Sequence, residues 1–196
     1  MVGERWTLLI VRELLLGPRR YSDLLANLEG ITTNLLAKRL KEMESAGILE
    51  KTVLPPPART AAYALTTSGR ELEPALLALG RWGWRFMDSP SKGDRIYLGW
   101  ALIALKRRFR GVSSPVTAEL ASDDLRFQLR LTQDYVDIRE GTPWIAEVAA
   151  EGSLPNMRDL FFNGASAAEL ASTGRLAVRG DLGAWKDFLR AFDLKA

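Results

Sequence analysis

The stretch Ile31–Leu54, ITTNLLAKRLKEMESAGILEKTVL, decides the fold of this chain. At about 100° per residue, one helical face is apolar. It consists of Leu36, Leu40 and Met43. The opposite face is polar and carries two cations. It consists of Asn34, Lys38, Lys41 and Ser45. We expect Thr32 or Thr33 to cap the start of this helix and Gly47 to end it, because a threonine oxygen accepts from free N–H groups and glycine tolerates the left-handed conformation.

The neighbouring segments predict a winged helix-turn-helix. Helices are expected at residues 4–16 and 22–28, with Gly30 making the turn into the opening stretch. After that stretch, residues 48–54 and 60–65 predict a hairpin. Its loop holds three consecutive prolines followed by Ala58 and Arg59. Proline fixes φ, so this loop should project as a preformed wing.

A long helix is expected from residue 68 to residue 87, capped by Thr66 or Thr67. Its apolar residues are Leu72, Leu76, Leu77, Leu79, Trp82, Trp84 and Phe86. They lie on more than one side, so the helix needs two partners: its own domain and a second subunit. Pro74 should kink it near the start.

Polar residues 88–94 predict a boundary between a domain at 1–88 and a second domain at 95–196. The second domain begins with a helix expected at 95–109. Alternating apolar and polar residues then indicate half-buried strands joined by short links. These strands are expected at 116–120, 125–131, 135–139 and 144–150, as an antiparallel meander. Two helices, a last strand at 175–179 and a closing helix at 181–192 complete an α+β fold with a sheet curled against helices.

Composition excludes several classes of function. The chain has 196 residues without histidine or cysteine, so it lacks the commonest general base, the commonest zinc ligand and any disulfide. No dense carboxylate cluster appears, and no cofactor, metal or catalytic residue is expected. Residues 1–88 hold 12 Lys and Arg against 10 Asp and Glu, which is too balanced for charge alone to indicate nucleic-acid binding. Without a membrane-length apolar run or a signal-peptide layout, we expect a cytoplasmic, nucleoid-associated protein.

A family resemblance runs through the first 88 residues. The residues that carry it are Gly3-Glu4-Arg5-Trp6-Thr7-Leu8-Leu9-Ile10, Arg12-Glu13-Leu14, Gly17-Pro18-Arg19-Arg20-Tyr21-Ser22-Asp23-Leu24, Gly30-Ile31-Thr32, Asn34-Leu35-Leu36, Arg39-Leu40-Lys41-Glu42-Met43, Gly47-Ile48, Tyr63-Ala64-Leu65-Thr66, Gly69 and Leu72. On these residues the chain resembles the HxlR-type winged-helix transcriptional regulators, which are related to the MarR regulators. The resemblance implies a dimer that binds operator DNA. Family members usually have further residues, often with a cysteine, ahead of the segment that begins here at Gly3.

The second domain resembles a sterol-carrier-type domain. The shared features are the order of helix, strands and helices, and a strand that runs into Gly-Asp. The best local match is Gly174-Arg175-Leu176-Ala177-Val178-Arg179-Gly180-Asp181. This resemblance implies an apolar tunnel and an apolar small ligand such as a lipid or acyl compound.

The polar helix face is the candidate DNA-reading surface. An asparagine suits adenine and a lysine suits guanine or phosphate, whereas the alternative is an ordinary solvated face. The hairpin and the preceding helix favour DNA contact. The contacts expected in the major groove are Thr33, Asn34, Lys38 and Lys41, with Arg59 in the minor groove and Arg20, Tyr21 and Ser22 on phosphates. Arg39 lies nearer the core edge, and phosphate contact and a structural ion pair are left open for it.

Aromatic and aliphatic residues of the second domain are candidates for a ligand cavity. They are Trp100, Phe127, Leu129, Trp144, Phe161, Phe162, Trp185 and Phe188. The alternative is that they simply pack a small core, because aromatic residues in this number are normal core material. The basic run at residues 106–110 is interpreted as placement at a helix C-terminus, with phosphate or acidic-ligand contact as the alternative.

The sequence therefore predicts a homodimeric DNA-binding regulator whose second domain senses an apolar molecule. The dimer is expected through the 68–87 helix, with the N-terminal helix as a second contact, and no membrane partner is expected. One alternative is a carrier or scavenger of apolar molecules whose winged domain contacts proteins. Another keeps DNA binding but makes the second domain a structural clamp for the dimer. An enzyme is the weakest candidate, because nothing nominates a nucleophile or base.

Overall fold

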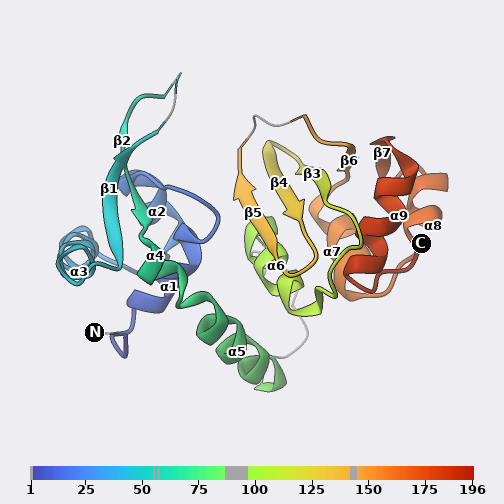
Figure 1. Ribbon diagram of the computed structural model, residues 1–196. Helices are drawn as coiled ribbons and strands as arrows, with labels where there is room; N and C mark the ends of the chain where they lie inside the picture. The colour runs from blue at the N-terminus through green and yellow to red at the C-terminus, as the bar shows by residue number, and fades with distance from the viewer. Residues whose placement is uncertain (1, 55, 57, 87–96, 142–144) are drawn as a thin grey trace. The chain divides into compact units, whose positions relative to one another are not determined.

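The computed structural model describes residues 2–54, 56, 58–86, 97–141 and 145–196 (Figure 1). The chain separates into two compact units, Met1–Phe86 and Met87–Ala196, and each is described by itself. The predicted boundary at 88–94 and the first two residues of the expected 95–109 helix lie outside the described residues. Within the described residues, no helix is long and apolar enough to cross a membrane.

Unit 1 has the element order of a winged helix-turn-helix. Its elements are α1 (Thr7–Leu14), α2 (Tyr21–Asn27), α3 (Thr33–Ser45), β1 (Leu49–Val53), β2 (Ala61–Leu65), α4 (Thr67–Arg70), α5 (Glu73–Gly83) and the 3-10 turn η1 (Trp84–Phe86). The strands β1 and β2 pair antiparallel, with Leu49 opposite Leu65. Arg19 forms an isolated antiparallel bridge to Tyr63 of β2. The predicted helix-turn-helix and hairpin are confirmed.

The core of unit 1 is built from one face of each helix and the base of the wing. Its apolar residues with no exposed surface are Ile10, Val11, Leu14, Leu24, Leu36 and Met43. Helix α1 packs against α2, α5 and β2, while α3 packs against β1. The helix that the opening stretch predicts is therefore held by its apolar face against the rest of unit 1.

The expected 68–87 helix is divided, and the prediction of one kinked helix is wrong. The Thr66 hydroxyl caps α4 by accepting from the Gly69 N–H at 3.0 Å, but α4 ends at Arg70. Helix α5 then begins at Glu73, with Pro74 in its first turn. Proline has no N–H, and the first turn is where an N–H has no partner within the helix. Pro74 therefore marks the start of a new helix.

Unit 2 holds a five-stranded sheet in the order β5-β4-β3-β6-β7. Its strands are β3 (Val116–Ser122), β4 (Leu125–Leu131), β5 (Val136–Glu140), β6 (Val148–Glu151) and β7 (Ala177–Gly180). The first three form the expected meander. The fourth was predicted wrongly, because β6 returns to lie parallel to β3 with Ala118 opposite Val148. Strand β7 then pairs antiparallel with β6, so the sheet is mixed.

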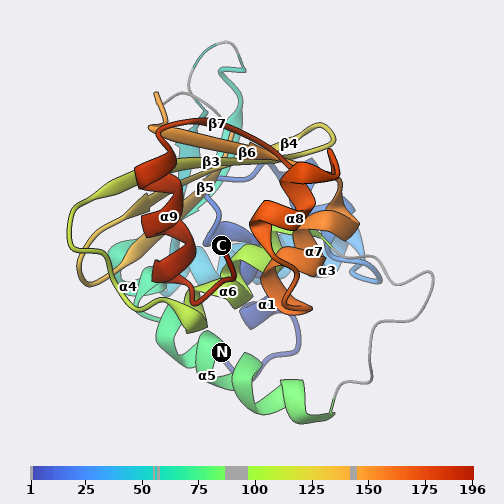
Figure 2. The same ribbon diagram turned by 90° about the vertical axis from the view of Figure 1, so that its right-hand side faces the viewer.

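Helices cover one face of this sheet (Figure 2). They are α6 (Leu98–Leu105), followed by the 3-10 turn η2 (Lys106–Arg108), α7 (Leu154–Phe162), α8 (Ala167–Ser172) and α9 (Leu182–Ala191). Phe127, Leu129 and Ile138 are fully buried on the covered face. The α+β class is confirmed. In the closing helix α9, Leu182 is exposed in the first turn after the Asp181 cap, although it is apolar.

Candidate nucleic-acid interface

Helix α3 begins as the sequence predicts. Thr32 is the cap, and its hydroxyl accepts from the Leu35 N–H at 3.4 Å. Gly47, at φ +69°, follows the helix end. The Tyr21 hydroxyl donates to the Thr33 carbonyl at 2.7 Å, which ties the first turn of α2 to the first turn of α3. Tyr21 therefore links the two helices, and its predicted phosphate contact stays a prediction.

The two faces of α3 differ sharply in burial. Leu36 and Met43 have no exposed surface, and Leu40 is 1% exposed. The four residues of the polar face are all exposed, and so is Thr33. They are Asn34, Lys38, Lys41 and Ser45. Among the described residues, neither Asn34 nor Lys41 forms a side-chain hydrogen bond or ion pair, so their polar groups are available to an external partner.

Arg39 is held by two carboxylates. One guanidinium nitrogen pairs with Glu42, one turn further along α3, and another pairs with Glu4 from the segment ahead of α1. Only 14% of the Arg39 side chain is exposed. Of the two roles left open by the sequence, the structure displays the structural ion pair. Glu4 lies 35 residues away in the chain, and no local pattern could have identified it.

The start of α2 carries its own carboxylate. Asp23 accepts from the Arg20 N–H at 3.1 Å and from the Ser22 hydroxyl at 3.3 Å. A helix N-terminus attracts anions because its N–H groups are free, and Asp23 already occupies one of them. The helix end therefore already holds a carboxylate, and phosphate contact by Arg20 stays a prediction.

The wing presents Arg59 at its end. Arg59 is exposed and adopts φ +38°, an uncommon conformation for a residue with a side chain. Pro56 is exposed as well, whereas Pro55 and Pro57 lie outside the described residues. Sequence reasoning missed one link: Lys51 of β1 pairs with Glu44 of α3 at 3.0 Å. The Glu44 carboxylate raises the pKa of Lys51 by accepting its hydrogen bond, and the pair links the wing to α3.

The predicted ligand residues of unit 2 lie mostly in its core. Phe127, Leu129, Phe161 and Phe188 have no exposed surface, and Trp185 is buried. Trp100 and Phe162 are half-buried, and Trp144 lies outside the described residues. The rings contact each other: Trp185 stacks on Phe188 with centroids 5.2 Å apart, and Tyr97 meets Phe127 edge-on at 6.3 Å. The ligand role of these residues stays a prediction.

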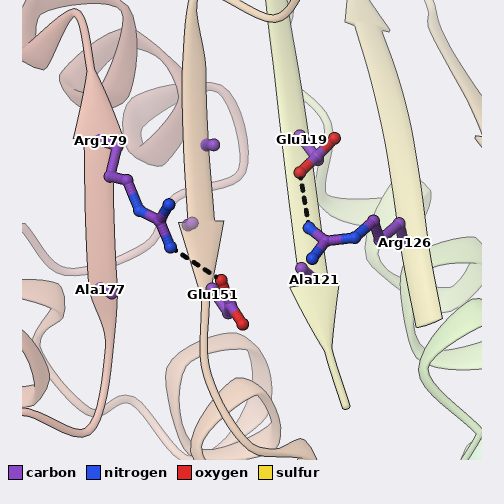
Figure 3. Close-up of a pocket in the computed structure, with 8 residues that line it drawn as sticks. Glu119, Ala121, Arg126, Glu151, Ala177 and Arg179 are labelled. Atoms are coloured by element: carbon purple, nitrogen blue, oxygen red, sulfur yellow. Dashed lines mark hydrogen bonds and ion pairs between the residues drawn. The ribbon is translucent and has the colours of Figure 1, made fainter. Parts of the chain in front are cut away.

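A small polar hollow lies on the uncovered face of the unit 2 sheet (Figure 3). It measures about 100 Å³ and is lined by Glu119, Ala121, Arg126, Ala149, Ala150, Glu151, Ala177 and Arg179. Two ion pairs, Arg126–Glu119 and Arg179–Glu151, border it at 3.0 Å each. It contains none of the predicted ligand residues and is smaller than the several hundred Å³ typical of ligand sites.

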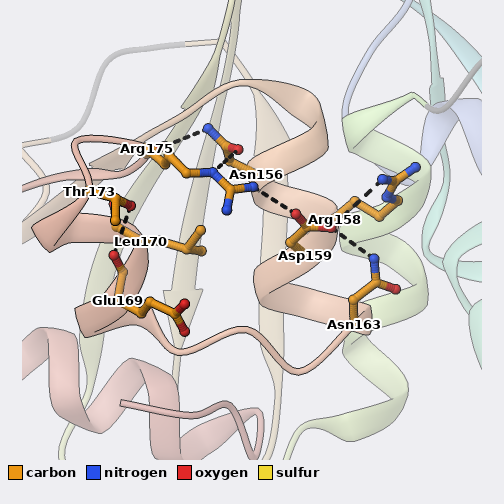
Figure 4. Close-up of polar contacts among 8 residues, drawn as sticks. All are labelled: Asn156, Arg158, Asp159, Asn163, Glu169, Leu170, Thr173 and Arg175. Carbon is orange, nitrogen blue, oxygen red and sulfur yellow. Dashed lines mark hydrogen bonds and ion pairs between the residues drawn. The ribbon is translucent and has the colours of Figure 1, made fainter.

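Two groups of charged residues in unit 2 have structural partners. Arg108, from the basic run, donates to the carbonyl of Phe161 at 2.7 Å and to that of Asp193. Asp159 of α7 accepts from the Asn163 amide at 2.8 Å and from Arg175 at 2.9 Å (Figure 4). The hydrogen bond from Asn163, followed by that from Arg175, lowers the pKa of Asp159. Both groups hold segments of unit 2 together. Among the described residues, no cluster of three or more potential metal ligands exists.

A winged helix-turn-helix with an exposed polar face on its third helix is the architecture of DNA-binding regulators. A family model described as HxlR-like helix-turn-helix matches residues 1–91. The chain is 34% identical over 88 residues to YvaP, an HTH-type transcriptional regulator of Bacillus subtilis, covering 45% of this chain and 82% of YvaP. It is 35% identical over 91 residues to the HTH-type regulator sll1512 of Synechocystis, covering 46% of this chain and 67% of that relative.

The chain belongs to the HxlR-like helix-turn-helix family. Among solved structures, the reduced form of the transcriptional regulator YodB from B. subtilis is 32% identical, with a TM-score of 0.39, covering 46% of this chain and 88% of that one. The family model ends at residue 91 and leaves almost all of unit 2 outside the match. The resemblance of 95–196 to a sterol-carrier-type domain stays a prediction.

Proposed function

We propose that this protein is a transcriptional regulator that places α3 in the major groove of operator DNA. The observation that carries the proposal is the division of α3, whose apolar face is fully buried while Asn34, Lys38 and Lys41 are exposed together. A helix of this kind fits the major groove, where asparagine and lysine read adenine and guanine. Arg59 enters the flanking minor groove, and Arg20 contacts a phosphate.

The regulator acts as a homodimer through α5. This helix has no buried side chain among its described residues, although several of its side chains are large and apolar. Leu79 is 50% exposed, Trp82 is 62% exposed and Phe86, in the following turn, is 71% exposed. Large apolar side chains gathered on one exposed helix indicate a protein–protein contact. A two-fold dimer binds an inverted repeat with half-sites about one or two helical turns apart.

Unit 2 serves as the sensor for an apolar effector in this proposal. The support is its resemblance to sterol-carrier-type domains and its aromatic core. An effector changes DNA binding only if it binds the two arrangements of the dimer with different affinities, a difference typically worth about 1–3 kcal/mol. The regulator acts on DNA in the cytoplasm. A DNA footprint that acyl compounds leave unchanged would contradict the sensor role without affecting the DNA-binding role.

The DNA-binding role can be tested without knowing the operator. The protein first selects duplexes of about 30 base pairs from a random library, a length that holds two half-sites. Binding of the selected duplex is then compared between the wild type and the triple variant Asn34→Ala, Lys38→Ala, Lys41→Ala. The matched control removes two exposed lysines of unit 2, Lys186→Ala with Lys195→Ala, and so loses the same charge.

We expect the triple variant to lose selective binding and the control to keep it. Unaffected affinity in the triple variant would refute the assignment of α3. Native mass spectrometry of gently purified protein distinguishes the carrier alternative. Bound lipid together with no selective DNA binding by the wild type would favour a carrier over a regulator.

A further inference from the structure

A carboxylate lies beside the proposed DNA-reading face of α3. Glu42 is half-buried, and its two oxygens engage two different cations. One oxygen lies 3.9 Å from the Lys38 ammonium, and the other accepts a hydrogen bond from Arg39. Arg39 is held from its other side by Glu4. The four side chains form a neutral cluster. Of these, only Lys38 belongs to the groove-facing row of α3, which consists of Asn34, Lys38, Lys41 and Ser45.

Helix stability does not account for this arrangement. In the Lys38–Glu42 pair the lysine precedes the glutamate, which is the less favourable orientation relative to the helix dipole. The Lys38 side chain is 66% exposed, and exposed ion pairs of this kind contribute little to folding. The larger effect of Glu42 is to keep a negative charge beside the Lys38 ammonium, next to bound DNA.

We infer that Glu42 is a specificity-determining positioning residue, an inference that rests on the proposed function. Its charge lies within a Debye length of any phosphate that Lys38 reaches, so it weakens binding to DNA of every sequence. Glu42 lies one turn further along α3 than Lys38 and attracts its ammonium. It thereby favours the ammonium positions that suit a correctly placed base or phosphate. Without Glu42, Lys38 becomes a mobile cation that grips phosphates regardless of sequence.

The structure confines this effect to Lys38. When Glu42 is neutralised, Arg39 keeps Glu4 as its partner and stays against the fold. Helix α3 also offers a matched control, because Glu44 is the other carboxylate of the helix and is likewise ion-paired. Its partner is Lys51 of β1, outside the groove-facing row. Glu42→Gln and Glu44→Gln change the net charge equally. The first releases Lys38 and removes one of the two carboxylate contacts of Arg39, whereas the second releases Lys51.

The test measures fluorescence anisotropy of a selected duplex and of a shuffled duplex over a range of KCl concentrations. We expect Glu42→Gln to steepen the salt dependence for the shuffled duplex by about 0.9 log units per log unit of salt, and to strengthen its binding by up to about eightfold at 0.1 M salt. Binding of the selected duplex should gain less, so the ratio of the two affinities falls at least about threefold. Glu44→Gln should leave this ratio unchanged.

A double-variant experiment separates positioning from a general structural effect. In a Lys38→Gln background, Glu42→Gln should no longer change the affinity ratio, and thermal melts should show that all variants fold. The inference is overturned if the wild type is selective and Glu42→Gln leaves the ratio of the two affinities unchanged. It is also overturned if Glu44→Gln lowers this ratio as much as Glu42→Gln does. In both cases the proposed function stands. A wild type that binds both duplexes equally overturns the two together.

Discussion

Replacing Trp82 by alanine should dissociate the proposed dimer. Trp82 is 62% exposed and lies against Phe86, with ring centroids 5.0 Å apart. A covered tryptophan buries about 150–250 Å², so about 120 Å² of Trp82 is open to a partner. At about 25 cal/mol per Å², full coverage would contribute about 3 kcal/mol. Alanine retains a methyl group and an interface rarely covers a residue completely, so about 2 kcal/mol per subunit is the expected loss.

The two-fold symmetry doubles this loss. Each subunit contributes the same residue to an isologous interface, so about 4 kcal/mol is lost per dimer. At about 1.4 kcal/mol per factor of ten, the dissociation constant should rise about 1,000-fold. Sedimentation velocity over nanomolar to micromolar protein concentrations measures this shift. Leu182→Ala, at an exposed apolar position of α9 in unit 2, is the control and should leave the dimer intact. A Trp82→Ala protein that dimerises as tightly as the wild type, or a monomeric wild type, would refute the assignment of α5.

Three further predictions concern stability. Thr32→Ala should lower the free energy of unfolding by about 1 kcal/mol in a urea titration, because it removes the cap of α3; no change would show that the 3.4 Å hydrogen bond contributes nothing. Gly69→Ala should cost about 3 kcal/mol or more in the same titration, since its new methyl group would lie 2.0 Å from the Ile48 carbonyl oxygen; a cost below that of Thr32→Ala would contradict the close packing of Gly69 against Ile48. For Asp159, the lowered pKa means that its stabilising effect is present above its ordinary pKa of 3.8 and is lost as the pH falls through the folded-state value. The wild type should therefore exceed Asp159→Asn in melting temperature near neutral pH, with a gap that narrows on acidification; a constant gap would refute this.

The sequence predicted unit 1 well because its signals are local. Helix α3 is specified by a 3.6-residue pattern, and Thr32 and Gly47 lie next to the ends that they determine. Pro74 was interpreted less successfully. A proline inside an apolar pattern can kink one helix or begin another, and only the turn at residues 71–72 distinguishes the two outcomes.

The other failures come from contacts between distant residues. Strand β6 was recognised as a strand, but the alternating pattern of β4 and β5, which lie between β3 and β6 in the chain, does not indicate which strand β6 pairs with. The same limit applies to the candidate site. The spacing within α3 predicted which residues face outward, whereas the pairing of Arg39 with Glu4 depends on how the segment ahead of α1 packs. Charge on a predicted face therefore overstates the charge available to DNA.

The core of unit 2 bears on how an effector could act. The aromatic residues considered for a ligand cavity pack on each other, as in the stacked pair of Trp185 and Phe188. Protein interiors are densely packed, so an apolar molecule among these rings has to displace at least one of them. Binding and a change in packing would then be a single event, which is the differential interaction that a switch requires. The hollow bordered by Arg126 and Arg179 is lined by none of these aromatic residues, so a molecule bound there would not contact them directly. A sensor role for unit 2 therefore depends on its buried rings and not on its visible hollow.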